Sequence, residues 1–419
     1  MLSYIKIDSA NQKERTLPMN VFKKSFCRIY QFIFRSAQPV LPYIEPKILK
    51  STDDIAKEIK ELNIDSALLV TDEFLKQSGA TAALENSLKQ SNIKCTVYSK
   101  TKPNPTVHNV EEAFRIYKSE NCKCIIAFGG GSSMDCAKAA GARAVYPNRS
   151  LSSLKGTLRI FRKLPPLFAV PTTAGTGSEV TVTAVITDSE KRHKYTMNSF
   201  PLIPRYAVLD PKVTFTLPKS LTATTGMDAL THAVEAYIGN STNKETRQLA
   251  EEAVKLVFEN IEAAYNDGEN EAARRNMLTA AYKAGIAFSK SYVGYIHAVA
   301  HSLGGQYNIP HGLANSVLMP IVLKEYGSAA YKKLYRLGVV AGVANENDAK
   351  ETGAKKFIAA IQQLNKNMQI PKKLSGIHKN DIPLMAKHAD KEANPLYPVP
   401  VLMNAKELEK FYYKVADWS

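Results

Sequence analysis

The first half of the chain repeats a single pattern, in which a short apolar run is followed by a polar or helical segment. The apolar runs occupy 66–72 (SALLVTD), 94–100 (KCTVYSK), 122–131 (CKCIIAFGGG), 167–173 (LFAVPTT) and 206–210 (YAVLD). Between the second and the third run, VEEAFRIYKSE has the apolar periodicity of a helix. Strands that are separated by helices need crossover connections, which are typical of a parallel sheet. The sequence therefore predicts an α/β domain over residues 46–216.

The second half has a different sequence pattern, because strand-like apolar runs almost vanish after residue 217. Helical periodicity continues through DALTHAVEAYI, TRQLAEEAVKLVFENIEAAYN, EAARRNMLTAAYKAGIAFSKS and YKKLYRLGVVAGV. A chain of 419 residues is long enough for two domains, each with its own core. We therefore expect an all-helical domain over 217–419.

Residues 1–45 form a leader segment that stands apart from both domains. Its phrase VFKKSFCRIYQFIFRSAQP mixes aromatic and basic residues at near-helical spacing. A basic amphipathic helix of this kind can lie on a membrane or against a partner. We favour the simpler alternative, in which the leader packs its aromatic residues on the main body.

Composition narrows the class of protein. No apolar run reaches 18 residues, so a transmembrane segment is not expected, and the N-terminus lacks the pattern of a secretory signal. The five cysteines are odd in number and irregularly spaced, which indicates reduced thiols and a cytoplasmic location. The net charge of +16 is scattered without a nucleic-acid motif, so we predict no nucleic-acid partner.

A glycine turn follows the most apolar of the predicted strands, in IIAFGGGSSMDCAKAAG. Glycines let the backbone approach a ligand, and the N-terminus of the following helix favours an anion. Gly130, Gly131 and Ser132 are therefore expected to face a pyrophosphate. The turn does not fit G-x-G-x-x-G, because Ser133 and Met134 occupy the later positions. Plain turn geometry explains such glycines about as well.

Two further stretches support a nucleotide site. PTTAGTGSEVT (171–181) places hydroxyl and backbone donors directly after an apolar run. Asp72 ends another run, where a carboxylate can accept hydrogen bonds from a ribose and would repel a 2′-phosphate. NAD is therefore favoured over NADP. The alternative for Asp72 is a helix N-cap before EFLKQSG.

Histidines are rare in this chain, with 8 in all, yet four of them lie in two phrases. Asp228 and His232 are spaced i, i+4 in DALTH, and His297 and His301 repeat that spacing in HAVAH. His311 follows shortly afterwards. One carboxylate and several imidazoles suit a divalent first-row ion such as Fe²⁺ or Zn²⁺. The alternative, that each histidine only fills a helix interface, is less attractive for a group of this size.

Four phrases, in this order, resemble the iron-containing (group III) alcohol dehydrogenases. They are GGGSSMDCAK, PTTAGTGSEVTVTAVITD, GMDALTHAVEAY and HAVAHSLGGQYNIPHGLAN, and the resemblance runs from about 47 to 419. It implies an N-terminal α/β, Rossmann-like nucleotide-binding domain and an all-α C-terminal metal-binding domain, the dehydroquinate synthase-like architecture. The active site is then expected in the cleft between them, and a homodimer or larger homo-oligomer is typical of the family.

The resemblance also implies roles for single residues. The metal ligands would be Asp228, His232, His297 and His311, with His301 close to the metal and the nicotinamide without being a ligand. The positions that match cofactor contacts are Asp72, Asn104, Gly130, Gly131, Ser132, Thr172, Thr173, Thr176, Thr181, Val185, Lys194, Thr214 and Leu217.

The function that we expect is transfer of a hydride between a primary alcohol or aldehyde and NAD(H). The metal would polarise the substrate oxygen, and His301 would pass the proton to solvent. An alternative is a glycerol dehydrogenase-like or other NAD-dependent polyol dehydrogenase of the same fold. A protein that binds nucleic acid or a membrane surface on an inactive enzyme scaffold would need damaged site positions, and the sequence has none.

Overall fold

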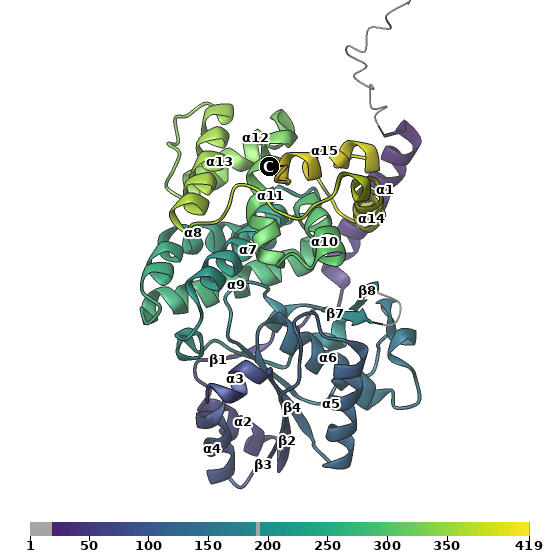
Figure 1. Ribbon diagram of the computed structural model, residues 1–419, viewed down its shortest axis with the longest axis vertical. Helices are drawn as coiled ribbons and strands as arrows, with labels where there is room; N and C mark the ends of the chain where they lie inside the picture. The colour runs from purple at the N-terminus through teal and green to yellow at the C-terminus, as the bar shows by residue number, and fades with distance from the viewer. Residues whose placement is uncertain (1–18, 190–192, 419) are drawn as a thin grey trace, which may run out of the picture.

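The computed structural model describes residues 19–189 and 193–418. Two parts are stacked along the long axis, with the sheet-containing part below and the helical part above in Figure 1. After the N-terminal helix, which lies against the helical part, the chain runs through the α/β part and then returns to the helical part. The predicted fold class is therefore confirmed, and the predicted boundary near residue 217 lies between the last strand and the first long helix of the second part.

A six-stranded sheet with only parallel neighbours forms the centre of the α/β part, in the order β1-β9-β6-β4-β2-β3. Its strands are β1 (Lys47–Leu49), β2 (Ser66–Val70), β3 (Lys94–Tyr98), β4 (Cys124–Gly129), β6 (Leu167–Pro171) and β9 (Tyr206–Val208). A second sheet, in the order β5-β8-β7, consists of β5 (Gly156–Thr157), β7 (Thr183–Asp188) and β8 (His193–Asn198).

Both faces of the large sheet are buried, which explains why its strands are almost continuously apolar. Alternate residues point to opposite faces, so Leu68 and Ile125 belong to one core whereas Leu69 and Ile126 belong to the other. One face is covered by α2 (Asp54–Glu61), α3 (Glu73–Gln77) and α4 (Ala82–Gln90), and the other by α5 (Val107–Ser119) and α6 (Gly131–Val145).

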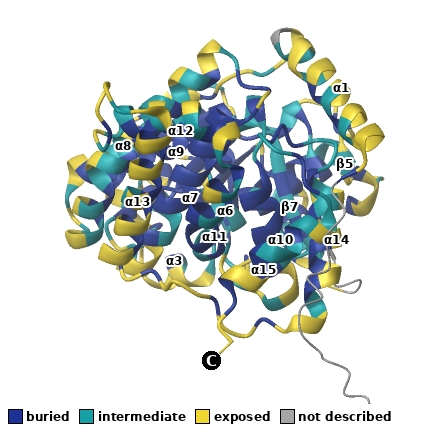
Figure 2. Cartoon of the chain, turned by 90° about the horizontal axis from the view of Figure 1, so that it is seen from above, coloured by how far each residue is buried: buried dark blue, intermediate teal, exposed yellow. Residues whose placement is uncertain are grey.

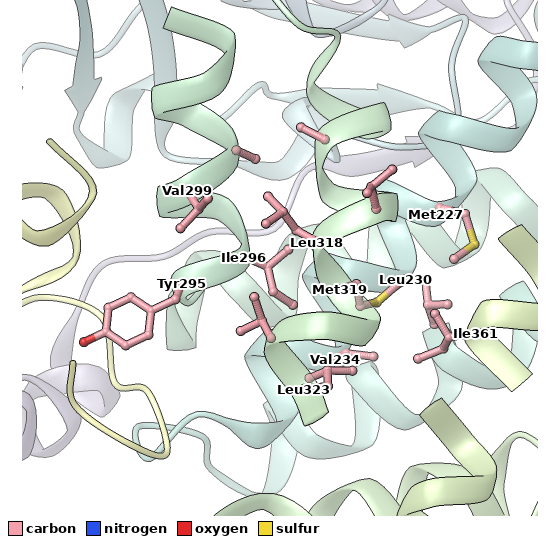
Figure 3. Close-up of a cluster of buried hydrophobic side chains, with 14 of the residues drawn as sticks. Met227, Leu230, Val234, Tyr295, Ile296, Val299, Leu318, Met319, Leu323 and Ile361 are labelled. Carbon is pink, nitrogen blue, oxygen red and sulfur yellow. The ribbon is translucent and has the colours of Figure 1, made fainter. Parts of the chain in front are cut away.

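The second part is built from helices that share one large core. They are α7 (Lys219–Ile238), α8 (Lys244–Asn266), α9 (Glu271–Ser291), α10 (Tyr295–Tyr307), α11 (His311–Tyr326), α12 (Ser328–Val340), α13 (Lys350–Asn367), α14 (Ile382–Ala393) and α15 (Ala405–Val415). Helix α7 is central, because α8, α9 and α11 all pack against it. Figure 3 shows this core, where Leu230 and Val234 of α7 meet Leu318 of α11 and Ile296 of α10.

The leader contributes α1 (Val21–Ala37), which lies against the helical part. It buries Cys27 and Gln31, and the ring of Phe34 lies 4.7 Å from that of Tyr292. Most of its other large apolar side chains, including Phe22 and Phe26, are exposed. The expectation that the leader packs its aromatic residues on the main body is therefore wrong for most of those in the described part of the leader, 19–45, because α1 binds the body mainly through polar side chains. Residues 1–18 of the leader lie outside the described residues.

Two smaller expectations concern cysteines and membrane segments. All five cysteines are free, and four of them are buried. Across the described residues, no helix combines the length and the apolar character that crossing a membrane requires.

Candidate active site

Three helices bring together the residues that we call the four-ligand cluster: Asp228, His232, His297 and His311. One ligand atom from each lies within 4.8 Å of the others. Asp228 Oδ1 is 3.8 Å from His297 Nε2 and 3.5 Å from His311 Nε2, and Asp228 Oδ2 is 4.0 Å from His232 Nδ1. A cation about 2.1 Å from four tetrahedral ligand atoms would hold those atoms about 3.4 Å apart. The observed separations therefore suit one shared ion better than direct hydrogen bonds.

Burial of two imidazoles tests whether the cluster fits a metal. The Nδ1 atom of His232 and the Nε2 atom of His297 are buried, and neither has a hydrogen-bond partner among the described residues. Leaving such a group unpaired costs about 1–3 kcal/mol. Both atoms belong to the cluster, so a single cation would satisfy both. The donor set of one carboxylate and three imidazoles fits Fe²⁺ or Zn²⁺.

Burial also keeps the clustered histidines neutral. It is the main reason that the pKa values of His232 and His297 fall below the usual range, and it lowers the pKa of His311 to about 4. A neutral imidazole has a free lone pair, which is the form that coordinates a metal. The cluster is thus prepared for a cation at neutral pH.

Glu235 is a residue of this site that the sequence analysis missed. Its Oε2 atom lies 2.6 Å from His297 Nδ1, and its carboxylate accepts hydrogen bonds from the backbone N–H groups of Gly294 and Ile296. Because Glu235 binds the Nδ1 atom of His297, the Nε2 atom of that ring remains free to act as a ligand in the four-ligand cluster. The sequence did contain a signal for Glu235, because Asp228, His232 and Glu235 are spaced i, i+4, i+7 and so lie on one face of α7.

Two more side chains outside the predicted set position the ligands. Asn315 donates a hydrogen bond of 2.7 Å to Asp228 Oδ1, and it lies one turn after His311 on α11. The ring of Phe288 stacks on that of His232, with 4.2 Å between centroids. Both contacts limit how far the ligands can turn.

His301 lies beside the cluster and is more open to solvent. Its ring centroid is 5.0 Å from that of His311, and 39% of its side chain is exposed. Its Nδ1 atom lies 2.6 Å from Oε1 of Glu392, which also accepts a hydrogen bond of 2.7 Å from Tyr397. Burial alone would lower the pKa of His301, but the negative charge of Glu392 and its hydrogen bond outweigh burial and raise it.

The predicted nucleotide residues gather at one edge of the large sheet. Strands β2, β4 and β6 are neighbours and parallel, so Asp72, Gly130 and Thr172 follow three adjacent carboxyl ends. Ligands of open parallel sheets bind at this edge. Asp72 also caps α3, because its Oδ1 accepts a 2.9 Å hydrogen bond from the N–H group of Leu75. The N-cap alternative is therefore realised for one of its oxygens.

Close packing explains the glycines of the turn. Gly129 has φ +152°, and a Cβ added there would lie 2.5 Å from Ser133 Oγ. A Cβ at Gly131, the first residue of α6, would lie 3.0 Å from Thr176 Cγ2. The turn thus needs glycine for its own geometry, and it also leaves the first N–H groups of α6 next to the hydroxyl-rich 171–181 stretch.

Asn104 connects the glycine turn with the helical part. Its backbone N–H group donates to Ser132 Oγ at 3.3 Å, and its side chain donates to Asn308 at 2.9 Å, just beyond α10. Lys194 in turn donates to Asn104 Oδ1 at 2.9 Å. Two predicted cofactor positions, Ser132 and Lys194, are therefore linked through a third, Asn104.

At several other predicted cofactor positions, the polar groups form hydrogen bonds within the protein. The hydroxyl group of Thr181 accepts a bond from Lys138 at 2.9 Å, and that of Thr214 donates to the Pro211 carbonyl at 2.7 Å. Both threonines are buried, as is Thr172. The N–H group of Val185 donates to Asp135. Thr173, Thr176 and Leu217 are half-buried.

Comparisons with known proteins cover both parts of the chain. The sequence profile of iron-containing alcohol dehydrogenases matches residues 49–211, and the profile for the C-terminal part of the same family matches 222–416. Alcohol dehydrogenase 4 of Saccharomyces cerevisiae is 37% identical over 345 residues, which are 81% of this chain and 88% of the yeast protein. The NAD-dependent methanol dehydrogenase of Bacillus methanolicus is 34% identical over 338 residues, 80% of this chain and 88% of that protein. A solved structure of 1,3-propanediol oxidoreductase superposes with a TM-score of 0.85 at 35% identity, covering 89% of this chain and 99% of its own.

Proposed function

The chain belongs to the iron-containing alcohol dehydrogenase family and is an NAD-dependent oxidoreductase that acts on CH–OH groups, and we propose that its four-ligand cluster holds Fe²⁺. The observation that carries this proposal is the pair of buried, unpartnered nitrogens on His232 and His297. Zn²⁺ has the same ligand preferences, so the choice of iron follows the family.

The cluster has one buried side and one open side. Asp228, His232 and His297 are buried, whereas His311 is partly exposed. The substrate oxygen would approach from the side of His311 and His301. When bound, the cation draws electron density from the substrate oxygen and so favours transfer of a hydride to or from the neighbouring carbon. The single carboxylate leaves the site with a net positive charge, which attracts an alkoxide.

His301 is the proposed route for the alcohol proton. Its Nδ1 atom is held by Glu392, so Nε2 is left to receive a proton from the substrate side. The partial exposure of the ring allows that proton to reach solvent. Tyr397 donates to the same Oε1 atom of Glu392 and so helps to keep the carboxylate, and with it the imidazole, in one orientation.

The sheet edge supports the proposed binding mode of the dinucleotide. The pyrophosphate would lie on the N-terminus of α6 at Gly130, Gly131 and Ser132, where free N–H groups and the helix dipole favour an anion. Asp72 would accept a hydrogen bond from the adenosine ribose and repel a 2′-phosphate, which favours NAD over NADP.

Small primary alcohols and their aldehydes are the proposed substrates, in line with the methanol and 1,3-propanediol enzymes among the relatives. Polyols such as glycerol are the second candidate, from the wider fold family. Homo-oligomeric assembly and a cytoplasmic location remain predictions from the sequence.

The test uses the full chain, purified without oxygen. We expect about one divalent cation per chain by elemental analysis, and formation of NADH from NAD⁺ with primary alcohols faster than with polyols. Asp228→Ala should lose the cation and lower kcat/KM by at least about a hundredfold. His388→Ala, which changes an exposed histidine, is the control and should leave both unchanged. A variant at Asp228 that keeps its metal and its activity would show that the assignment is wrong.

A further inference from the structure

The polar side of helix α1 faces the rest of the protein. Arg28 donates hydrogen bonds to the backbone carbonyls of Val399 and Pro400, at 2.8 and 3.0 Å. Gln31 is buried and donates to the carbonyls of Pro395 and Tyr397, at 3.0 and 2.8 Å. These two side chains alone donate to four backbone carbonyls of the helical part. Hydrogen bonds, more than apolar packing, hold α1 in place.

The opposite side of α1 is apolar and faces outward. Phe22, Phe26, Ile29 and Ile33 are spaced i, i+4, i+7, i+11, so they form one strip along the helix. Their exposed fractions are 85%, 59%, 60% and 61%. The term "outer face of α1" is used below for its exposed apolar residues, which are Val21, Phe22, Phe26, Ile29, Tyr30, Phe32 and Ile33. In Figure 2, α1 lies at the rim of the molecule and is exposed along most of its length.

The shared fold does not account for this face. The family match begins at residue 49, after α1 has ended, and none of the residues of the four-ligand cluster lies on α1. A contiguous exposed apolar surface on a soluble protein marks a place where another surface binds. In a globular protein the apolar side of a helix usually faces the core, but in α1 it faces solvent. The outer face is therefore stable only when an apolar surface covers it.

Charge indicates what that covering surface is. Helix α1 contains Lys23, Lys24, Arg28 and Arg35 and has no acidic residue, and the whole chain has a net charge of +16. A second copy would bring two such charges together. The strip is also small, because a helix of 17 residues is about 25 Å long and about 10 Å wide, well below the roughly 800 Å² per partner of a stable interface.

We propose that the outer face of α1 docks the enzyme on an anionic lipid surface. The helix lies parallel to the membrane, with the aromatic and aliphatic strip in the boundary between headgroups and acyl chains. Lys23 and Arg35 lie outside the strip and contact the protein, where Lys23 pairs with Asp390 at 2.9 Å and Arg35 donates a hydrogen bond of 3.4 Å to the Asn240 carbonyl. The attraction to lipid phosphates therefore comes from the net positive charge of α1 and of the whole chain. Such docking needs no membrane-spanning segment, because only one face of the helix enters the bilayer.

The experiment is flotation of the full chain with vesicles of phosphatidylcholine alone or of an equimolar mixture of phosphatidylcholine and phosphatidylserine. We expect the chain to float with the mixed vesicles and more weakly with the neutral ones. The combined variant Phe22→Gln, Phe26→Gln and Ile33→Gln should bind the mixed vesicles at least about tenfold more weakly. Gln favours helices, and the three positions are exposed, so the fold and the NADH-forming activity without vesicles should be unchanged.

Phe74→Gln is the control for the loss of an exposed aromatic side chain outside α1. Phe74 is 64% exposed, close to the 59% of Phe26, and it lies on α3, far from α1 in both Figure 1 and Figure 2. The control should float like the unchanged protein. Absence of flotation, equal flotation of the triple variant, or equal binding to both vesicle types would overturn the proposal. A dimer that the triple variant dissociates, measured by light scattering without vesicles, would also overturn it, because a second copy would then cover the face.

Discussion

Glu235 Oε2 lies 2.6 Å from His297 Nδ1, and both side chains are almost completely buried. This contact fixes the imidazole of a proposed metal ligand through the nitrogen that does not face the cluster. The same carboxylate is held by the backbone at the start of α10, so the position of His297 depends on the contact between α7 and α10.

Glu235→Gln should weaken metal binding without removing a ligand. The amide oxygen can still accept one of the two backbone hydrogen bonds, but the side chain no longer carries the charge that raises the basicity of His297. Loss of such a partner typically costs about 10–100-fold in metal affinity. Competition with a chelator measures the change directly. Glu259→Gln alters an exposed carboxylate on α8 and should have no effect; an unchanged metal affinity in the Glu235 variant would show that the contact is only structural.

Glu392→Gln should move the pH profile of alcohol oxidation. Glu392 raises the pKa of His301, and oxidation needs His301 unprotonated to receive the alcohol proton. Activity therefore rises as the pH increases through this pKa. Removing the charge lowers the pKa, so the rising limb of kcat/KM should shift to lower pH.

His388→Gln serves as the comparison for that shift, because it changes an exposed residue on the same helix, α14. A pH profile of the Glu392 variant that coincides with that of the unchanged enzyme would remove His301 from the proton route. A uniform loss of activity at all pH values would instead indicate a purely structural contact.

The sequence predicted those features that depend on local spacing. The apolar runs were recognisable as strands because both faces of the sheet are buried, so that neighbours such as Leu68 and Leu69 are both apolar. Asp228 and His232 lie one helical turn apart on α7, and their shared face followed from that spacing. Glu392 carried no such signal, because it lies 91 positions after His301 and reaches it only through the packing of α14 on α10.

The leader shows a different limit of sequence reasoning. Periodicity predicted a helix, and the usual rule placed its apolar side inward. The structure reverses the orientation, because Arg28 and Gln31 donate hydrogen bonds to four backbone carbonyl groups in the segment from Pro395 to Pro400. Those acceptors are backbone atoms more than 360 positions away, so no pattern within α1 could reveal them.

Gly129→Ala should destabilise the α/β part. Its φ of +152° is strained for any side chain, and the new Cβ would meet Ser133 Oγ at 2.5 Å. We expect a loss of about 1–3 kcal/mol in the free energy of unfolding, measured with urea, and a higher KM for NAD⁺. Gly305→Ala is the contrasting change, because a Cβ there meets nothing within 4 Å inside α10. It should stabilise the protein by about 0.5–1 kcal/mol; equal effects of the two variants would contradict this account of the turn.

Asp72 can be tested for its two roles separately, because serine and alanine differ as helix caps. Asp72 Oδ1 caps α3 through the N–H group of Leu75. Serine keeps a capping oxygen and alanine does not, so only Asp72→Ala should lower the free energy of unfolding, by about 1 kcal/mol. Both variants remove the charge that would repel a 2′-phosphate, so both should raise kcat/KM with NADP⁺ relative to NAD⁺ by about tenfold or more. If the ratio stays constant in both while the stabilities differ as expected, Asp72 is a cap alone, and the preference for NAD must come from another residue at the sheet edge.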